Sequence, residues 1–209
     1  MPNPPGRPED APMQAYFDGL YGANDDPYGL DDRWYEQRKR ALLLASLPRP
    51  RYRNAYEPGC GAGALTAELA PRCQALLAAD FSARAVEVTR TRTASLPGVR
   101  VERHRLPDDW PGASGPFDLI VLSELGYFLD ADAMAVLAQR CAGSLAADGT
   151  LLACDWRIDF PQRRLATQSV HALLENLGLH RLARHEEDDF LLQVWSADAR
   201  SVAQREAIR

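Results

Sequence analysis

The stretch EPGCGAG contains three glycines at alternate positions, Gly59, Gly61 and Gly63, with the acid Glu57 in front of them. A glycine-rich turn between a strand and a helix lets backbone N–H groups approach a ligand closely, and nucleoside cofactors are bound in this way. We therefore predict that this turn, including Cys60, contacts a cofactor. Cys60 has no activating neighbour in the sequence, so we assign it no reaction of its own.

Two kinds of nucleoside cofactor fit these glycines. The letters GCGAGA satisfy the dinucleotide pattern G-x-G-x-x-G/A, so an NAD(P)-dependent oxidoreductase is one hypothesis. The carboxylate of Glu57, however, stands at a strand end, where it suits a ligand that carries positive charge. The chain also offers no second domain that would present a substrate to a hydride donor. Both observations favour a cationic nucleoside.

A second acid, Asp80, ends the next apolar run, QALLAAD. An acid at the end of the second strand can accept hydrogen bonds from both hydroxyls of a ribose. Phe81 follows it, and its ring is placed to lie along an adenine. Asp80 therefore supports nucleoside binding of either kind, while the alternative is that it only opens the next helix.

These residues need strands and helices that position them, and the hydrophobic pattern predicts both. Strands that alternate with helices predict an α/β fold, a Rossmann-like three-layer sandwich with a seven-stranded, mostly parallel sheet. The last two strands have no room for a helix between them, so we expect an antiparallel pair at one edge. The predicted helices cover 34–47, 63–70, 82–96, 132–145 and 169–178, and the predicted strands cover 54–57, 74–80, 99–106, 117–125, 150–156, 179–185 and 189–197.

The domain organisation is simple. The proline-rich residues 1–15 are expected to form a disordered leader. Residues 16–200 are expected to form one domain, in which 16–47 make a helical lid, and 201–209 are expected to be a tail. A chain of 209 residues is long enough for such a core.

Composition excludes several classes of protein. The apolar fraction of 46%, the charged fraction of 25% and the net charge of -5 are those of a globular protein that does not bind nucleic acid. No apolar run is long enough to span a membrane, and the N-terminus lacks the core of a signal peptide. The four cysteines have no C-x-x-C pair and no zinc spacing, so we expect a reduced, cytoplasmic protein without a metal.

Taken together, these motifs resemble those of class I S-adenosylmethionine-dependent methyltransferases. EPGCGAG is similar to the glycine motif of that family, AADFS to its ribose-binding acid, and FDLIVLSEL and DGTLLAC to its fourth and fifth strands. A narrower resemblance, to the nodulation protein S (NodS) methyltransferases, runs through DDPYGLDDRWYEQRK, LPRPRYRNAYEPGCGAG, FDLIVLSELGYFL, VHALL and EEDDFLLQVW. That subfamily N-methylates the free amino group of a chito-oligosaccharide signal. The resemblance implies S-adenosylmethionine as cofactor, S-adenosylhomocysteine as product, and no metal.

The resemblance also implies roles for the residues that would hold the cofactor. Glu57 would organise the methionine ammonium, the three glycines would line the methionine and ribose, and Asp80 would bind the ribose hydroxyls. The other residues expected at the cofactor are Arg105 and Leu106 at the adenine, Ser123, Glu124 and Leu125 beside the sulfonium, and Trp34 and Arg38 from the helix before the sheet.

At the acceptor end, the resemblance makes Glu124 the charge most expected at the reacting centre. It would accept a hydrogen bond from an acceptor amine, and Tyr127 would help to shape the pocket. Where the fifth strand of the family ends in His-Trp-Arg, this chain has Asp155-Trp156-Arg157, so the acceptor is not carried over. The remaining candidates for substrate binding are Tyr28, Tyr35, Trp156, His171 and Glu187, each of which has packing or a solvated surface as its alternative.

The sequence thus predicts a methyltransferase that acts on a small molecule by in-line transfer. It offers carboxylates but no firmly placed histidine, which favours an amine over a phenol or alcohol that would need a base. O-methylation of a small molecule remains an alternative, and so do the oxidoreductase and a non-catalytic protein that keeps the fold.

Overall fold

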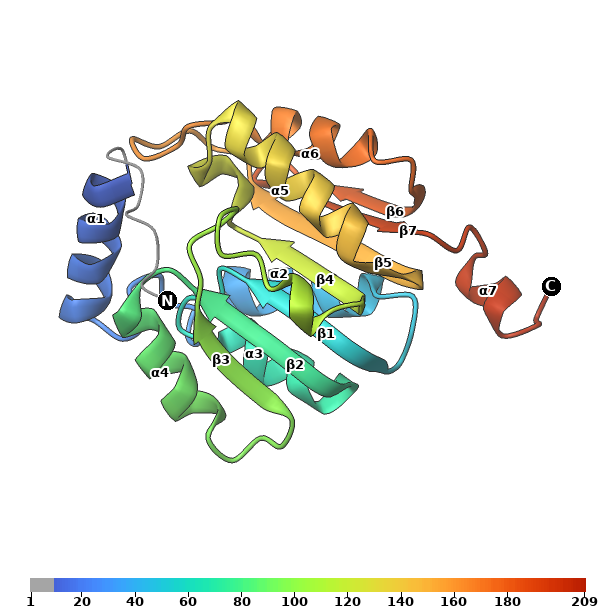
Figure 1. The fold of residues 1–209 in the computed structure, drawn as a ribbon, viewed down its shortest axis with the longest axis horizontal. Helices are drawn as coiled ribbons and strands as arrows, with labels where there is room; N and C mark the ends of the chain where they lie inside the picture. The colour runs from blue at the N-terminus through green and yellow to red at the C-terminus, as the bar shows by residue number, and fades with distance from the viewer. Residues whose placement is uncertain (1–9) are drawn as a thin grey trace.

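Seven strands form one sheet in the computed structural model, which describes residues 10–209 (Figure 1). The strands are β1 Tyr52–Pro58, β2 Cys73–Asp80, β3 Val99–Arg103, β4 Phe117–Ser123, β5 Leu145–Trp156, β6 His180–Glu186 and β7 Phe190–Ser196. The helices are α1 Asp10–Ala23, α2 Trp34–Ser46, α3 Ala64–Leu69, α4 Ala83–Thr93, α5 Ala131–Ser144, α6 Thr167–Glu175 and α7 Val202–Arg205, with short 3-10 turns η1 Ala70–Arg72, η2 Gly112–Ser114 and η3 Gly126–Phe128.

The strand order is β3-β2-β1-β4-β5-β7-β6, and only β7 runs against its neighbours. This confirms the mostly parallel sheet with an antiparallel pair at one edge. The chain moves outward in one direction from β1 to β3 and in the other direction from β4 onward. In sheets of this kind a ligand binds beyond the carboxyl ends of the strands, where the order reverses. The expected location is therefore the end of β1 and β4.

Helices cover both faces of the sheet, which confirms the three-layer sandwich. Alternate residues of a strand point to opposite faces, so Ile120 and Leu122 pack toward α5 and α6 while Leu119 and Val121 pack toward α2 and α3. All four side chains are buried. Figure 1 shows α5 and α6 side by side on one face of the sheet. A strand buried on both faces reads as a continuous apolar run, which is why β4 was recognisable in the sequence.

The N-terminal segment differs from its prediction. Residues 1–9 lie outside the described part of the chain, but the rest of the expected leader is helical, because α1 begins at Asp10. Phe17 and Tyr21 are one helical turn apart and pack with Ala62 and Phe81. This tertiary packing stabilises a helix that the proline-rich composition did not reveal. Figure 1 shows α1 standing across the end of the sheet where the strands terminate.

Within residues 10–209, no helix combines the length and the apolar character needed to cross a membrane.

Candidate active site

A cavity of about 510 Å³ lies where the strand order reverses. Its floor is formed by the residues that follow β1, β2, β3 and β4, and its roof is formed by α1, α2 and the segment 24–33 between them. This volume is within the range of about 300–1,000 Å³ that is usual for small-molecule sites. The cavity therefore has the place and the size expected of a cofactor and acceptor site.

The glycine turn makes a close-fitting cradle at one end of the cavity. Gly59, Gly61 and Gly63 have φ values of 76°, 54° and 75°, in the left-handed region that side chains disfavour. A Cβ atom on Gly59 would lie 3.3 Å from the side chain of Leu125, and one on Gly61 would lie 2.7 Å from the Tyr21 hydroxyl. Glycine is therefore required here both by conformation and by space.

Glu57 supplies a buried carboxylate beside this cradle. Its residue is 3% exposed, and its Oε2 atom has no hydrogen-bond partner among the described residues. Burial raises the pKa of Glu57 to about 8. A buried carboxylate is costly unless a positive group pairs with it. The side chain therefore fits the ammonium group of the methionine part of S-adenosylmethionine.

Asp80 supplies a second carboxylate at the end of β2. Its Oδ2 accepts a hydrogen bond from the Gly61 N–H at 3.0 Å, and its Oδ1 accepts one from the Ser82 N–H at 2.9 Å. Burial raises the pKa of Asp80 to about 6. Each carboxylate oxygen can accept more than one hydrogen bond, so both remain able to receive a ribose hydroxyl. Glu57 and Asp80 together match the charges and hydroxyls of S-adenosylmethionine.

The adenine end is bordered by residues after β3. Arg105 and Leu106 line the cavity there, next to His104. The imidazole of His104 is fixed on both sides, with Nδ1 3.1 Å from the Tyr56 hydroxyl and Nε2 3.1 Å from a Glu102 carboxylate oxygen. A ring held in this way presents a constant surface to a ligand.

Glu124 lines the same cavity, on a tight turn after β4. Its φ of 56° is in the left-handed region, which is uncommon for a residue with a side chain and is often found at functional sites. Its Oε2 accepts hydrogen bonds from the Tyr127 hydroxyl at 2.5 Å and from the Trp156 N–H at 3.0 Å. Its Oε1 lies 2.7 Å from the Lys39 Nζ. The carboxylate is therefore held in one orientation beside the glycine turn.

Most of the residues that the sequence singled out lie around this one cavity. It is lined by Tyr28, Glu57, Gly59, Cys60, Gly61, Asp80, Phe81, Arg105, Leu106, Ser123, Glu124, Leu125, Tyr127 and Trp156. Six others are not part of the lining, namely Trp34, Tyr35, Arg38, Gly63, His171 and Glu187.

Trp34 and Arg38 are the clearest corrections to the expected cofactor contacts. Trp34 is 72% exposed and does not cover the cavity. Arg38 forms two hydrogen bonds with the Glu187 carboxylate, at 2.9 and 2.7 Å, and neither residue is part of the cavity lining. Both Trp34 and Arg38 lie on the side of α2 that is turned away from the cavity, because Leu43 and Leu47 pack on the sheet and set the rotation of the helix.

The other three residues have packing roles. His171 is buried on α6, with Nδ1 2.7 Å from Gln193 Oε1 and Nε2 3.2 Å from Asp155 Oδ2. Tyr35 packs edge-on against Trp156, with ring centroids 5.4 Å apart, and so supports the cavity wall from behind. Gly63 is packed against α4, where an added Cβ would lie 2.8 Å from a Thr89 methyl group.

Sequence reasoning missed the polar residues that α2 and α1 contribute. Glu36, Lys39 and Arg40 line the cavity from α2, and Tyr21 lines it from α1. The signal was present in the spacing, because Glu36, Lys39 and Leu43 recur at three- and four-residue intervals and so share a face of the helix. The apolar end of this face packs on the sheet, and its polar end reaches the cavity.

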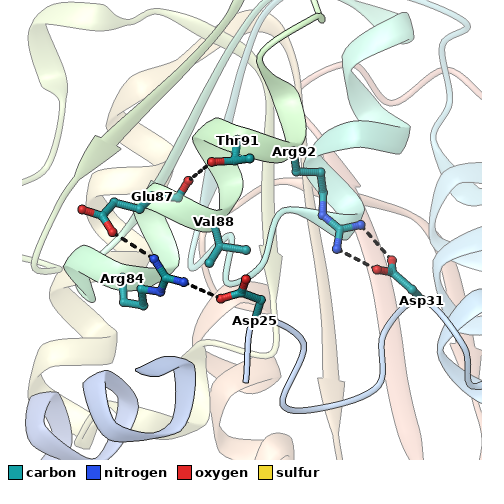
Figure 2. A pocket seen from close by; sticks show the side chains of 7 residues that line it. All are labelled: Asp25, Asp31, Arg84, Glu87, Val88, Thr91 and Arg92. Carbon is teal, nitrogen blue, oxygen red and sulfur yellow. Dashed lines mark hydrogen bonds and ion pairs between the residues drawn. The ribbon is translucent and has the colours of Figure 1, made fainter. Parts of the chain in front are cut away.

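Ion pairs fasten the segment 24–33, which forms part of the roof, to α4. Arg84 lies 2.8 Å from Asp25, and Arg92 makes two parallel hydrogen bonds with Asp31 at 2.8 and 2.7 Å (Figure 2). The same segment carries Tyr28 into the cavity. These pairs therefore hold the roof over the cofactor cradle.

Within residues 10–209, no group of three or more His, Cys, Asp or Glu side chains is arranged to hold a metal ion. All four cysteines are free.

Comparison with known proteins agrees with this site. The family model of nodulation protein S (NodS) matches residues 21–180. Nodulation protein S of Bradyrhizobium diazoefficiens is 35% identical over 146 residues, which are 68% of this chain and 68% of that protein.

Two solved structures extend the comparison. A proposed methyltransferase from Pseudomonas syringae is 52% identical with a TM-score of 0.70, covering 78% of this chain and 99% of that one. The N-methyltransferase NodS from Bradyrhizobium japonicum WM9, in complex with S-adenosyl-L-homocysteine, is 27% identical with a TM-score of 0.77, covering 88% of this chain and 97% of that one.

The sheet order, the glycine cradle and the two buried acids define a class I S-adenosylmethionine-dependent methyltransferase. Within that class, the chain belongs to the NodS family, because the family model covers most of its length.

Proposed function

We propose that this protein N-methylates a small-molecule amine with S-adenosylmethionine as methyl donor. The observation that carries the proposal is the arrangement of charge in one cavity. Two buried acids, Glu57 and Asp80, and a fixed carboxylate, Glu124, line this cavity together. A relative in the same family, the B. japonicum protein, is named as an N-methyltransferase.

When bound, S-adenosylmethionine supplies an electrophilic methyl group on its sulfonium sulfur, so transfer is an in-line displacement. The protein has to align the acceptor nitrogen with that methyl group and exclude water, and alignment alone can lower a barrier by about 7–11 kcal/mol. Leu125, which lies against the glycine cradle, and Tyr127 both line the cavity.

Glu124 is suited to orient the acceptor amine. Its carboxylate can accept a hydrogen bond from the amine N–H and so direct the nitrogen lone pair toward the methyl group. A neutral amine needs no strong base, only the loss of one proton. An alcohol would need a base to remove its proton at the methyl group. His171 is held by Gln193 and Asp155 outside the cavity lining. His104 lines the cavity, but both of its ring nitrogens are paired, with Tyr56 and Glu102.

We further propose that residues 10–47 act as a lid on a single domain that reaches to about residue 200. The segment contributes lining residues from α1, from α2 and from the stretch 24–33 between them. The four free cysteines suit a reducing cytoplasm.

The experiment is a transfer assay with isotopically labelled S-adenosylmethionine and a panel of amines, amino sugars, phenols and alcohols. The amino sugars should include a chitopentaose with one free amino group, in view of the family. We expect label in amines only, and loss of transfer when Asp80→Asn weakens cofactor binding. Transfer to phenols or alcohols in preference to amines would overturn N-methylation, and tight binding of NAD(P)H without S-adenosylhomocysteine binding would overturn the cofactor.

A further inference from the structure

Lys39 is the only lysine of the chain, and it is buried. It lies on α2 with 6% of its surface exposed, and its Nζ atom is 2.7 Å from Glu124 Oε1 and 3.0 Å from Glu36 Oε2. The ring of Tyr35 lies 5.2 Å from the same nitrogen. A buried ammonium is stable only when opposite charges surround it, and here two carboxylates do so.

The ammonium of Lys39 is present as a cation at neutral pH. Burial would lower the pKa of Lys39, but Glu124 and Glu36 oppose that effect and raise the pKa above its ordinary value. Because 23 of the 24 lysine and arginine residues are arginine, the lysine at position 39 indicates that this position requires the geometry of an ammonium group. A compact ammonium with three donors fits between two carboxylates, whereas the planar guanidinium of arginine is larger and prefers bidentate pairing.

The contact with Lys39 completes the set of hydrogen bonds to Glu124. A carboxylate has about four acceptor positions. Three of them are taken, by Lys39, by the Tyr127 hydroxyl and by the Trp156 N–H. The side chain of Glu124 is still 29% exposed, and it lines the cavity. One acceptor position, on Oε1, is therefore left on a side chain that is partly open to the cavity.

The three donors come from three separate parts of the chain, so the orientation of Glu124 depends on the tertiary structure. Tyr127 and Trp156 both bind Oε2, and Lys39 alone binds Oε1. Without Lys39, the carboxylate could rotate about its Cγ–Cδ bond, because no other described residue donates a hydrogen bond to Oε1.

We propose that Lys39 is a positioning residue for methyl transfer, which fixes Glu124 so that its free acceptor position meets the nitrogen of the acceptor amine. This inference rests on the proposed function, since the positioned group acts on an amine. Glu36 and Glu124 take two of the three hydrogen-bond donors of Lys39, and the positioning role requires no contact between Lys39 and the acceptor.

The uniqueness of Lys39 permits a test that needs no acceptor. Protein grown with lysine labelled at its ζ nitrogen should give one side-chain ammonium signal by NMR, protected from exchange with water. Glu124→Gln should shift this signal strongly and speed the exchange. Arg49→Met breaks a comparable ion pair, with Asp148 at 2.8 Å, outside the cavity lining and should leave the signal unchanged. A signal that does not respond to Glu124→Gln would overturn the contact.

The functional test compares Lys39→Met and Lys39→Arg in the full chain, with the free-amino chitopentaose as acceptor probe. Lys39→Met should lower kcat by roughly 10- to 100-fold, the range expected for a misaligned reactant. The dissociation constant of S-adenosylhomocysteine should change less than threefold. Lys39→Arg should recover part of kcat, because it keeps a cation beside Glu124, and Arg49→Met should keep the kcat of the natural protein.

The outcomes are separable. An unchanged kcat in Lys39→Met would overturn the positioning role. So would a loss of cofactor binding equal to the loss of kcat, because that pattern indicates general damage to the cavity. If the natural protein methylates no amine in the panel, the proposed function fails, while the NMR result still decides whether Lys39 holds Glu124.

Discussion

Two carboxylates with the same chemistry have different tasks in this cavity because their surroundings differ. Glu57 is buried with an unpaired oxygen, and its pKa is raised to about 8. Glu124 has three donors and is partly open to the cavity. These surroundings fit the roles that we propose, in which Glu57 receives a positive charge from the cofactor and Glu124 holds the acceptor.

The raised pKa of Glu57 predicts that cofactor affinity depends on pH. An ammonium beside Glu57 favours the ionised carboxylate, so binding must release a proton below about pH 8. The affinity for S-adenosylhomocysteine should therefore rise as the pH increases from 6 to 8. Calorimetry in buffers of different ionisation enthalpy would measure the released proton directly.

The same shift has the opposite sign for stability without the cofactor. The folded protein binds this proton more tightly than the unfolded chain, in which the carboxyl group has its ordinary pKa of 4.5. The contribution of Glu57 to the free energy of unfolding is therefore full below pH 4.5 and is lost as the pH rises toward 8. Glu57→Gln should flatten the affinity profile over pH 6–8 and reduce the loss of stability between pH 4.5 and 8. An affinity that is flat with pH in the natural protein would contradict the role of Glu57.

At the scale of elements, the roof of the cavity depends on α1, α2 and the segment between them. Its closure combines apolar packing of Phe17 and Tyr21 with the ion pairs between the segment 24–33 and α4 (Figure 2). Exposed ion pairs contribute only about 0.2–1 kcal/mol each. The packing therefore contributes more than the ion pairs to holding the roof in place.

We predict that Arg92→Met loosens the roof without unfolding the domain. Hydrogen exchange over residues 24–33 should become faster, and the affinity for S-adenosylhomocysteine should fall a few-fold, because one bidentate pair with Asp31 is lost. The matched control is Arg200→Met, which removes an exposed pair with Asp198 near the C-terminus. Equal effects of the two variants would show that Arg92 has no special link to the roof.

At the scale of the whole molecule, the cofactor should act as a strong stabiliser. Its cavity joins the ends of β1, β2 and β4 to the N-terminal helices, so a bound ligand holds together segments that are far apart in the chain. A ligand at 100 times its dissociation constant adds about 2.7 kcal/mol to the free energy of unfolding.

For a domain of this size, that gain predicts a rise in Tm of roughly 5–10 °C with S-adenosylhomocysteine, measured by calorimetry. NADH at the same concentration should leave Tm unchanged. A Tm that rises with NADH and not with S-adenosylhomocysteine would instead support a dinucleotide-binding role for the glycine turn.

The order of the seven strands and of helices α2 to α6, the glycine turn and the acids Glu57, Asp80 and Glu124 were predictable from the sequence. Their signals are local, because a buried strand needs an apolar run, a left-handed turn needs glycine, and a strand end needs only its last residue to be identified. The starts of β2, α4 and β4 accordingly agree with the prediction to within one residue.

Only the tertiary structure decided which face of each flanking helix meets the cavity. Each residue turns a helix by about 100°, so neighbouring side chains on α2 point in different directions and have different surroundings. Lys39 enters the cavity and Arg38 pairs with Glu187, because the packing of Leu43 on the sheet sets the rotation of the helix. The sequence by itself determined the fold and the acids of the cofactor end, and long-range packing decided how the acceptor end is built.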